Sequence, residues 1–255
     1  TPTEAAAVCA VGAVLLAALR SGRAQVAGAL CIGAFAVLMI LRALLDLAPR
    51  KAARIEADGH EVEVDLALVR PGDLLRVRFI NRSEHQHTMH FHGIHTAEMD
   101  GVPMLGRGII SPGEDFTYTF DAEPFGLHLY HCHVGPLAEH IARGMYGTFI
   151  VDPKAGRPPA DELVLVQHGY NTTFDGQGNQ LYAVNGIPFV YMNDPIRVPR
   201  GKLVRIYLVN LLEYDPINSF HLHGNFFDSF PTATRLEPTE FTDTVIQDQG
   251  QRGIR

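Results

Sequence analysis

The fold class follows from two stretches in which apolar and polar residues alternate, Leu74-Leu-Arg-Val-Arg-Phe-Ile80 and Phe116-Thr-Tyr-Thr-Phe120. Alternation with a period of two is typical of strands that bury one face. Turn-forming residues precede both stretches, as Pro71-Gly-Asp73 and Ser111-Pro-Gly-Glu114, and such turns connect neighbouring antiparallel strands. We therefore expect an all-β fold of short antiparallel strands.

A second series of strand-like segments follows at residues 163–166, 196–198 and 203–209. The two series are separated by Asp152-Pro-Lys-Ala-Gly-Arg-Pro-Pro159, a proline-rich stretch typical of a domain boundary. The sequence thus predicts two β-sandwich domains of the same type, over residues 53–153 and 160–255. A motif is repeated between them, since His90-Phe-His-Gly93 is echoed by His221-Leu-His-Gly224.

The first 51 residues have a different character, because residues 5–19 and 24–41 carry no charge. The second run would span about 27 Å as a helix, which is enough to cross a bilayer. A secretory signal fits poorly, because no basic stretch precedes the first run and no Ala-x-Ala-like site follows the second. We expect residues 1–51 to form membrane helices or an anchor. The alternative is a buried helical hairpin of a soluble protein.

Charge and cysteine content exclude two classes of protein. Residues 1–54 hold six Lys/Arg against two acidic residues, which leaves fifteen basic and twenty-six acidic residues in the remainder, a net charge of −11. This balance argues against a nucleic-acid partner. Cys132 is the one cysteine outside the apolar leader, so a scaffold held together by disulfides is excluded.

Histidine is concentrated between His85 and His140, where nine of the thirteen lie. Residues two apart in a strand share a face, so each of three His-x-His pairs directs two imidazoles the same way. The pairs are His90 and His92, His131 and His133, and His221 and His223. Cys132 lies between two of these histidines and must point to the opposite face. We therefore expect two sites on the two sides of one strand, joined by adjacent residues.

The side of the strand that holds Cys132 can be completed with His87, His140 and Met145. One thiolate, two imidazoles and a thioether form the trigonal soft site that suits blue copper. Zinc would accept the first three groups, but a thioether suits zinc poorly and structural zinc sites use more thiolates. For Met145 alone, packing in the core is the alternative.

At this point the chain resembles the multicopper oxidases, the laccase-like blue copper enzymes. The resemblance covers roughly residues 62–250, and the stretches that carry it are His90-Phe-His-Gly-Ile-His-Thr-Ala-Glu-Met-Asp-Gly-Val-Pro103, Ile110-Ser-Pro-Gly113, Phe116-Thr-Tyr-Thr-Phe120, Gly126-Leu-His-Leu-Tyr-His-Cys-His133, Asn185-Gly186 and His221-Leu-His-Gly224. It implies two cupredoxin-like Greek-key domains, a type 1 copper that takes electrons from a reductant, and a trinuclear copper cluster that reduces dioxygen to water.

Carried over by position, the resemblance implies type 1 copper ligands at His87, Cys132, His140 and Met145. It implies trinuclear cluster ligands at His90, His92, His131, His133, His221 and His223. Asp100 resembles the carboxylate that handles protons near the cluster, with a turn residue as the equal alternative. The resemblance gives no role to His85, His95 and His128, and we expect them to face solvent.

Two departures from the family pattern are visible. Asn218 stands where the later domain often has a type 1 histidine, so we expect the blue copper in domain one alone, as in one two-domain subgroup. A complete cluster needs eight imidazoles and the chain supplies six, so we expect domain 2 to be C-terminally incomplete. The resemblance to that subgroup implies a homotrimer. The short linker at residues 152–159 also favours contact between domain one of one copy and domain two of the next.

Two alternative functions stay open. Copper nitrite reductases share the layout, but in that family an aspartate resembles the position of His90 and a non-histidine follows the Cys, where this chain has His133. A non-catalytic electron-transfer cupredoxin would leave four of the cluster histidines unexplained. The expected partners are dioxygen, the membrane, and a reductant that is a small molecule, a metal ion or an electron-donor protein. We expect the catalytic domains to be membrane-anchored and extracytoplasmic, in the periplasm or at the cell surface.

Overall fold

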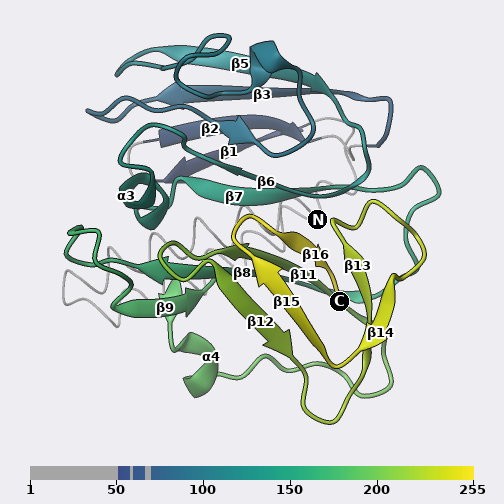
Figure 1. Cartoon of the computed structure of the whole chain (residues 1–255). Coiled ribbons are helices and arrows are strands. Elements are labelled where there is room, and N and C mark those ends of the chain that lie inside the picture. The colour runs from purple at the N-terminus through teal and green to yellow at the C-terminus, as the bar shows by residue number, and fades with distance from the viewer. Residues whose placement is uncertain (1–50, 58–59, 67–69) are drawn as a thin grey trace.

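The computed structural model describes residues 51–57, 60–66 and 70–255 (Figure 1). The predicted membrane segment therefore lies outside the described residues, apart from its last residue. Within these described ranges, no helix combines the length and the apolar character that crossing a bilayer requires.

The first half of the chain consists of two antiparallel sheets. The four-stranded sheet has the order β1 (Lys51–Ala57), β2 (His60–Leu66), β3 (Leu74–Asn81) and β5 (Asp115–Asp121), and the three-stranded sheet has the order β4 (His90–Phe91), β6 (Gly126–His131) and β7 (Tyr146–Val151). Two short helices lie in the connections, η1 (Ala97–Met99) and α3 (Leu137–Ala142).

The core of the first half follows from the alternation along β3 and β5. Val77 and Phe79 are buried, and Val77 pairs with Tyr118 across the two strands. Phe91 of the second sheet contacts Tyr118 and Phe120, with ring centroids 5.3 and 4.9 Å apart. Aromatic side chains from both sheets thus pack together and form the apolar layer between the two sheets.

The second half contains a larger mixed sheet and a separate ribbon. The seven-stranded sheet has the order β10 (Ile187–Pro188), β9 (Leu181–Val184), β8 (Asp161–Tyr170), β11 (Val204–Leu211), β16 (Arg252–Ile254), β13 (Phe227–Pro231) and β14 (Glu240–Thr242). The ribbon pairs β12 (Ile217–His221) with β15 (Thr244–Asp248), and the short helix α4 (Val190–Asn193) follows β10.

Two expectations about strands are corrected here. β8 and β11 run parallel, in register from Val204 opposite Asp161, whereas we expected antiparallel neighbours. No strand forms at residues 196–198. Pro195 and Pro199 flank that segment, and a proline offers no N–H to a strand ladder. Its apolar side chains are exposed as a result, Val198 by 51%.

The two halves share an apolar core. The sheet with β6 and β7 lies between the four-stranded sheet and the second half (Figure 1). Leu129 and Tyr146 of this sheet pack in one cluster with Val166 and Tyr207. The backbone N–H of Leu127 donates to the carbonyl of Thr232 at 2.9 Å. The short linker at residues 152–159 therefore does not prevent the two halves of one chain from packing against each other.

Candidate metal centres

Cys132 and two histidines form the first centre. The Sγ of Cys132 lies 3.6 Å from Nδ1 of His87 and 3.3 Å from Nδ1 of His140, and these two nitrogens are 3.1 Å apart. The three ligand atoms come from the end of β6, from the loop before β4 and from α3. Three soft or borderline ligands thus converge on one point, as a metal ion requires.

The backbone holds this centre together. His87 exchanges two hydrogen bonds with Ile110, and the N–H of Cys132 donates to the carbonyl of Met145 at 2.9 Å. Met145 donates in turn to the carbonyl of His140 at 3.1 Å. Met145 is almost fully buried and belongs to the same apolar cluster as Cys132, so its role as the axial ligand stays a prediction.

Burial sets the protonation of the first centre. It raises the pKa of the Cys132 thiol and lowers the pKa of His140. A neutral imidazole has the lone pair that a metal needs, and a metal cation supplies the positive charge that a buried thiolate needs. The donor set therefore fits copper.

The second centre is a cluster of four imidazoles that we call the histidine cluster: His90, His92, His131 and His133. The ring of His90 lies 4.8 Å from that of His92, 5.4 Å from that of His131 and 5.2 Å from that of His133. Nε2 of His92 and Nε2 of His131 are 2.9 Å apart. Strand pairing explains the proximity, because His90 lies opposite His131 in the ladder of β4 and β6.

Carbonyl groups orient two of these rings. Nδ1 of His90 donates to the carbonyl of Asp100 and Nδ1 of His131 to that of Cys132, both at 2.8 Å. With Nδ1 donating, each Nε2 keeps its lone pair for a metal. Burial, together with neighbouring imidazoles, lowers the pKa of His92 to about 3 and that of His131 to about 4. These rings are neutral at neutral pH and fit copper.

Asp100 lies behind His90, and its Oδ1 is 3.1 Å from both Nδ1 of His90 and Nε2 of His95. Our expectation that His95 faces solvent is therefore wrong, since its side chain is only 11% exposed. His95 and Asp100 are near neighbours in sequence, but the period-two pattern gave no signal for their contact.

His128 does not face solvent either. It is 1% exposed, stacks on Phe149 with ring centroids 5.1 Å apart, and places Nε2 2.9 Å from the carbonyl of Pro124. The apolar neighbours Leu127 and Leu129 were the available signal for burial. His85 is exposed, as expected.

His221 and His223 form a separate pair, with ring centroids 4.7 Å apart. Nδ1 of His221 lies 2.9 Å from the carbonyl of Asp243, so its Nε2 is also available to a metal. Both side chains are exposed. In the described part of the chain, no ring contact or shared ligand group joins this pair to the histidine cluster.

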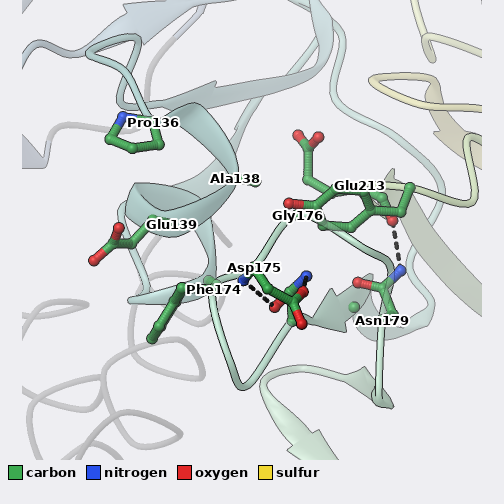
Figure 2. A pocket seen from close by; sticks show the side chains of 12 residues that line it. Pro136, Ala138, Glu139, Phe174, Asp175, Gly176, Asn179 and Glu213 are labelled. Carbon is green, nitrogen blue, oxygen red and sulfur yellow. Dashed lines mark hydrogen bonds between the residues drawn. The ribbon is translucent and has the colours of Figure 1, made fainter.

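A cavity of about 210 Å³ lies behind α3 (Figure 2). Ala138 and Glu139 line it from the helix, and Phe174 and Asp175 line it from a loop of the second half. His140 is not among its lining residues, so this cavity is distinct from both metal centres. Sequence reasoning missed it, because its walls come from segments far apart in the chain.

A β fold in which one cysteine and two histidines converge beside a histidine cluster is typical of a cupredoxin-like copper protein. The chain belongs to the multicopper oxidase family: residues 61–156 and 158–252 match two family models, each described as "Multicopper oxidase". Proteins of this family are copper-binding oxidoreductases.

One similar solved structure is a multicopper oxidase that is 54% identical to this chain. The match covers 80% of this chain and 75% of the oxidase chain, with a TM-score of 0.70. A blue copper oxidase from Nitrosomonas europaea is 29% identical over 80% of this chain and 72% of its own, with a TM-score of 0.65. A copper-containing nitrite reductase from Neisseria meningitidis is 32% identical over 179 residues, 63% of this chain. The chain spans 45% of the length of that curated relative.

Proposed function

We propose that this chain couples the one-electron oxidation of a reductant at the Cys132 centre to the four-electron reduction of dioxygen to water at a trinuclear copper cluster. The observation that carries the proposal is the packing of four imidazoles, those of the histidine cluster, directly beside Cys132. Copper would supply one-electron redox chemistry at the first centre and oxygen reduction at the second.

The chain itself provides the connection between the centres. His131 and His133 flank Cys132 in sequence, and Nδ1 of His131 is held by the carbonyl of Cys132. An electron that enters through the thiolate therefore needs to cross only adjacent residues. Asp100 is the candidate proton-handling carboxylate, because its Oδ1 lies 3.1 Å from His90, inside the same cluster.

The test of this assignment is the copper content and spectrum of the copper-loaded protein. A blue centre plus a trinuclear cluster with all eight imidazoles gives four copper ions per chain in the assembled protein, with one type 1 and one type 2 signal in electron paramagnetic resonance. One copper per chain, with a type 1 signal alone, would instead indicate the electron-transfer cupredoxin.

We propose further that His221 and His223 complete the cluster of a neighbouring copy, in a homotrimer. The support is that both rings are exposed and lie apart from the histidine cluster of their own chain. A heterologous interface that closes into a ring would bring the two ligand sets together. The double variant His221→Ala plus His223→Ala should then lose both cluster copper and the trimer, as measured by metal analysis and analytical ultracentrifugation. A fully active monomer would exclude this arrangement.

Copper nitrite reduction is the second candidate, favoured by the 32% identity to the Neisseria meningitidis enzyme. The family resemblance argues against it at two positions, because His90 and His133 stand where nitrite reductases are expected to have other residues. Removal of type 2 copper separates the two candidate functions. It should abolish oxygen uptake if the protein is an oxidase, and nitrite consumption if the protein is a nitrite reductase.

The reductant and the location also belong to this proposal. We propose a small molecule, a metal ion or an electron-donor protein as the reductant. Initial rates with cuprous ion, ferrous ion and a simple phenol would rank the reductants.

We also propose that residues 1–51 tether the two domains outside the cytoplasm. A reporter fused after Arg255 that is active only in the cytoplasm would contradict this location.

A further inference from the structure

Arg252 of β16 extends from the second half of the chain to the turn that follows His92. Its guanidinium donates to the carbonyl of Leu127 at 2.7 Å and to the carbonyl of His92 at 3.3 Å. The N–H of His92 donates to the carbonyl of Leu129 at 2.9 Å. Both backbone polar groups of His92 therefore have partners. The carbonyl contacts Arg252 of the second half and also lies 3.4 Å from Nδ1 of His128.

The two turns are in direct contact. Gly93 has a φ of +73°, and a Cβ built on it would lie 3.6 Å from Nη2 of Arg252. Gly250 has a φ of +78°, and its Cβ would lie 3.6 Å from Cε1 of His92. The second half thus reaches both the carbonyl and the ring of His92, over glycines that leave room for the approach.

His92 depends on its backbone for orientation more than His90, His131 and His221 do. His90, His131 and His221 each place Nδ1 within hydrogen-bonding distance of a carbonyl. Within the described residues, the ring of His92 has no such carbonyl partner, and its one hydrogen-bond contact is with Nε2 of His131. The bond from Arg252 to the His92 carbonyl therefore adds to the few contacts that orient this ring.

The charge of Arg252 is not balanced by an ion pair. Burial lowers the pKa of its guanidinium, which remains cationic because the ordinary value exceeds 12. Across the described ranges, no carboxylate forms a salt bridge with it. Three carbonyls solvate the guanidinium instead, the third being that of Gly250 at 3.4 Å. Three acceptors around one side chain suit the planar guanidinium of arginine, which has several N–H donors, better than the single ammonium group of lysine.

We propose that Arg252 is a positioning residue for the histidine cluster: it holds the His92 carbonyl, and so makes copper binding by His92 depend on docking of the second half of the chain. The inference rests on the proposed function, because it requires His92 to be a copper ligand. Outer-shell groups that orient a ligand typically change metal affinity about 10- to 100-fold when they are removed.

Three variants of the copper-loaded protein test this role. Arg252→Met removes the donors and keeps much of the length, Arg252→Lys keeps the charge but not the fork, and Arg157→Met is the matched control. Arg157 is also a buried arginine, which donates to the carbonyl of Ala233 at 2.6 Å and lies over Phe125. Each variant is compared with wild type by the blue absorption of the Cys132 centre, the type 2 resonance signal, and the affinity of the cluster for added copper.

We expect Arg252→Met to keep the blue centre and to bind cluster copper about 10- to 100-fold more weakly. Arg252→Lys should also bind cluster copper more weakly than wild type, and this variant provides the test if Arg252→Met does not fold. Arg157→Met should bind cluster copper as wild type does. If either Arg252 variant bound cluster copper as tightly as wild type does, the inference would be overturned. It would also be overturned if the Arg252 variants and Arg157→Met lost both centres equally. Both outcomes would leave the proposed function standing. Absence of cluster copper from the wild-type protein would overturn the proposed function, and the inference with it.

Discussion

At the scale of single residues, Cys132 has the most demanding environment, because its thiol is fully buried and burial raises its pKa. We expect Cys132→Ser to abolish the intense visible absorption of a copper–thiolate bond, since serine offers no soft anionic ligand. The absorption spectrum of the copper-loaded variant checks this directly. A variant that remained blue would place the copper–thiolate bond elsewhere.

Met145 separates a ligand role from a packing role. We expect Met145→Leu to keep the blue centre but to shift its reduction potential, because a long axial ligand tunes the potential more than it anchors the metal. The free energy of unfolding should change by less than about 1.5 kcal/mol, since the two side chains have similar volumes. Redox titration and urea unfolding measure the two quantities. An unchanged potential would leave Met145 as a core residue only.

His168 predicts a pH dependence of stability. It is 1% exposed and stacks on Tyr146, and burial lowers its pKa to about 4. Its ordinary pKa is about 6.5, so between pH 6.5 and 4 the unfolded chain binds a proton that the folded chain does not. Its contribution is therefore intact above pH 6.5 and falls as the pH drops toward 4, by on the order of 3 kcal/mol.

We expect His168→Phe to lose less stability than wild type between pH 7 and pH 4.5. Urea unfolding at the two pH values measures this, with the exposed His85→Gln as control. If His168→Phe and wild type lost the same free energy of unfolding, His168 would be protonated in the folded protein at the lower pH.

Spacing along the chain indicated which histidines would share a face and lie near Cys132, but it did not indicate the residues that support them. His87, Cys132 and His140 could be proposed because their residue types occur close together around a strand. Arg252 contacts the carbonyl of His92 across 160 residues, and no local pattern encodes such a contact. His95 was missed for a related reason, because its contact with Asp100 depends on the turn between them.

At the scale of elements, the ribbon of β12 and β15 has an exposed face beside the second histidine pair. Ile217 and Ile246 are 68% and 70% exposed, and Phe241 of the neighbouring β14 is 68% exposed. Large exposed apolar side chains gathered on one surface are typical of an interaction site. Their position next to His221 supports the proposed contact with a second copy.

Ile246→Asp tests the ribbon surface without touching a ligand. We expect the variant to keep the stability of the isolated chain, because the side chain is exposed, and to weaken the trimer by placing an unpaired charge in the interface. Sedimentation across a range of protein concentrations measures this, with Val198→Asp on a different exposed segment as control. A trimer of unchanged affinity in Ile246→Asp would remove this ribbon from the interface.

Alternation predicted strands better than it predicted their pairing. The stretches that become β3 and β5 were found because each buries alternate side chains, whereas β11 is buried continuously from Tyr207 onward. The parallel pairing of β8 with β11 was not foreseen, since parallel and antiparallel partners leave similar patterns in a buried strand. The false strand at residues 196–198 had the right residue types, but its flanking prolines prevent pairing.

At the scale of the whole molecule, packing between the halves is compatible with the proposed ring. Tyr146 and Tyr207 share the core between the halves of one chain, while His221 and His223 remain exposed on another face. One chain can therefore hold its own halves together and still present ligands to a neighbour. The linker length alone could not predict this, because residues 152–159 only limit the separation of the halves.

The central claim is oxygen reduction by a cluster fed from the Cys132 centre. The most direct test is the number of electrons taken from a one-electron reductant per dioxygen consumed, recorded with an oxygen electrode while nitrite is present. We predict four electrons per dioxygen, the number that yields water, with nitrite left unchanged. Conversion of nitrite to nitric oxide without oxygen uptake would contradict the account.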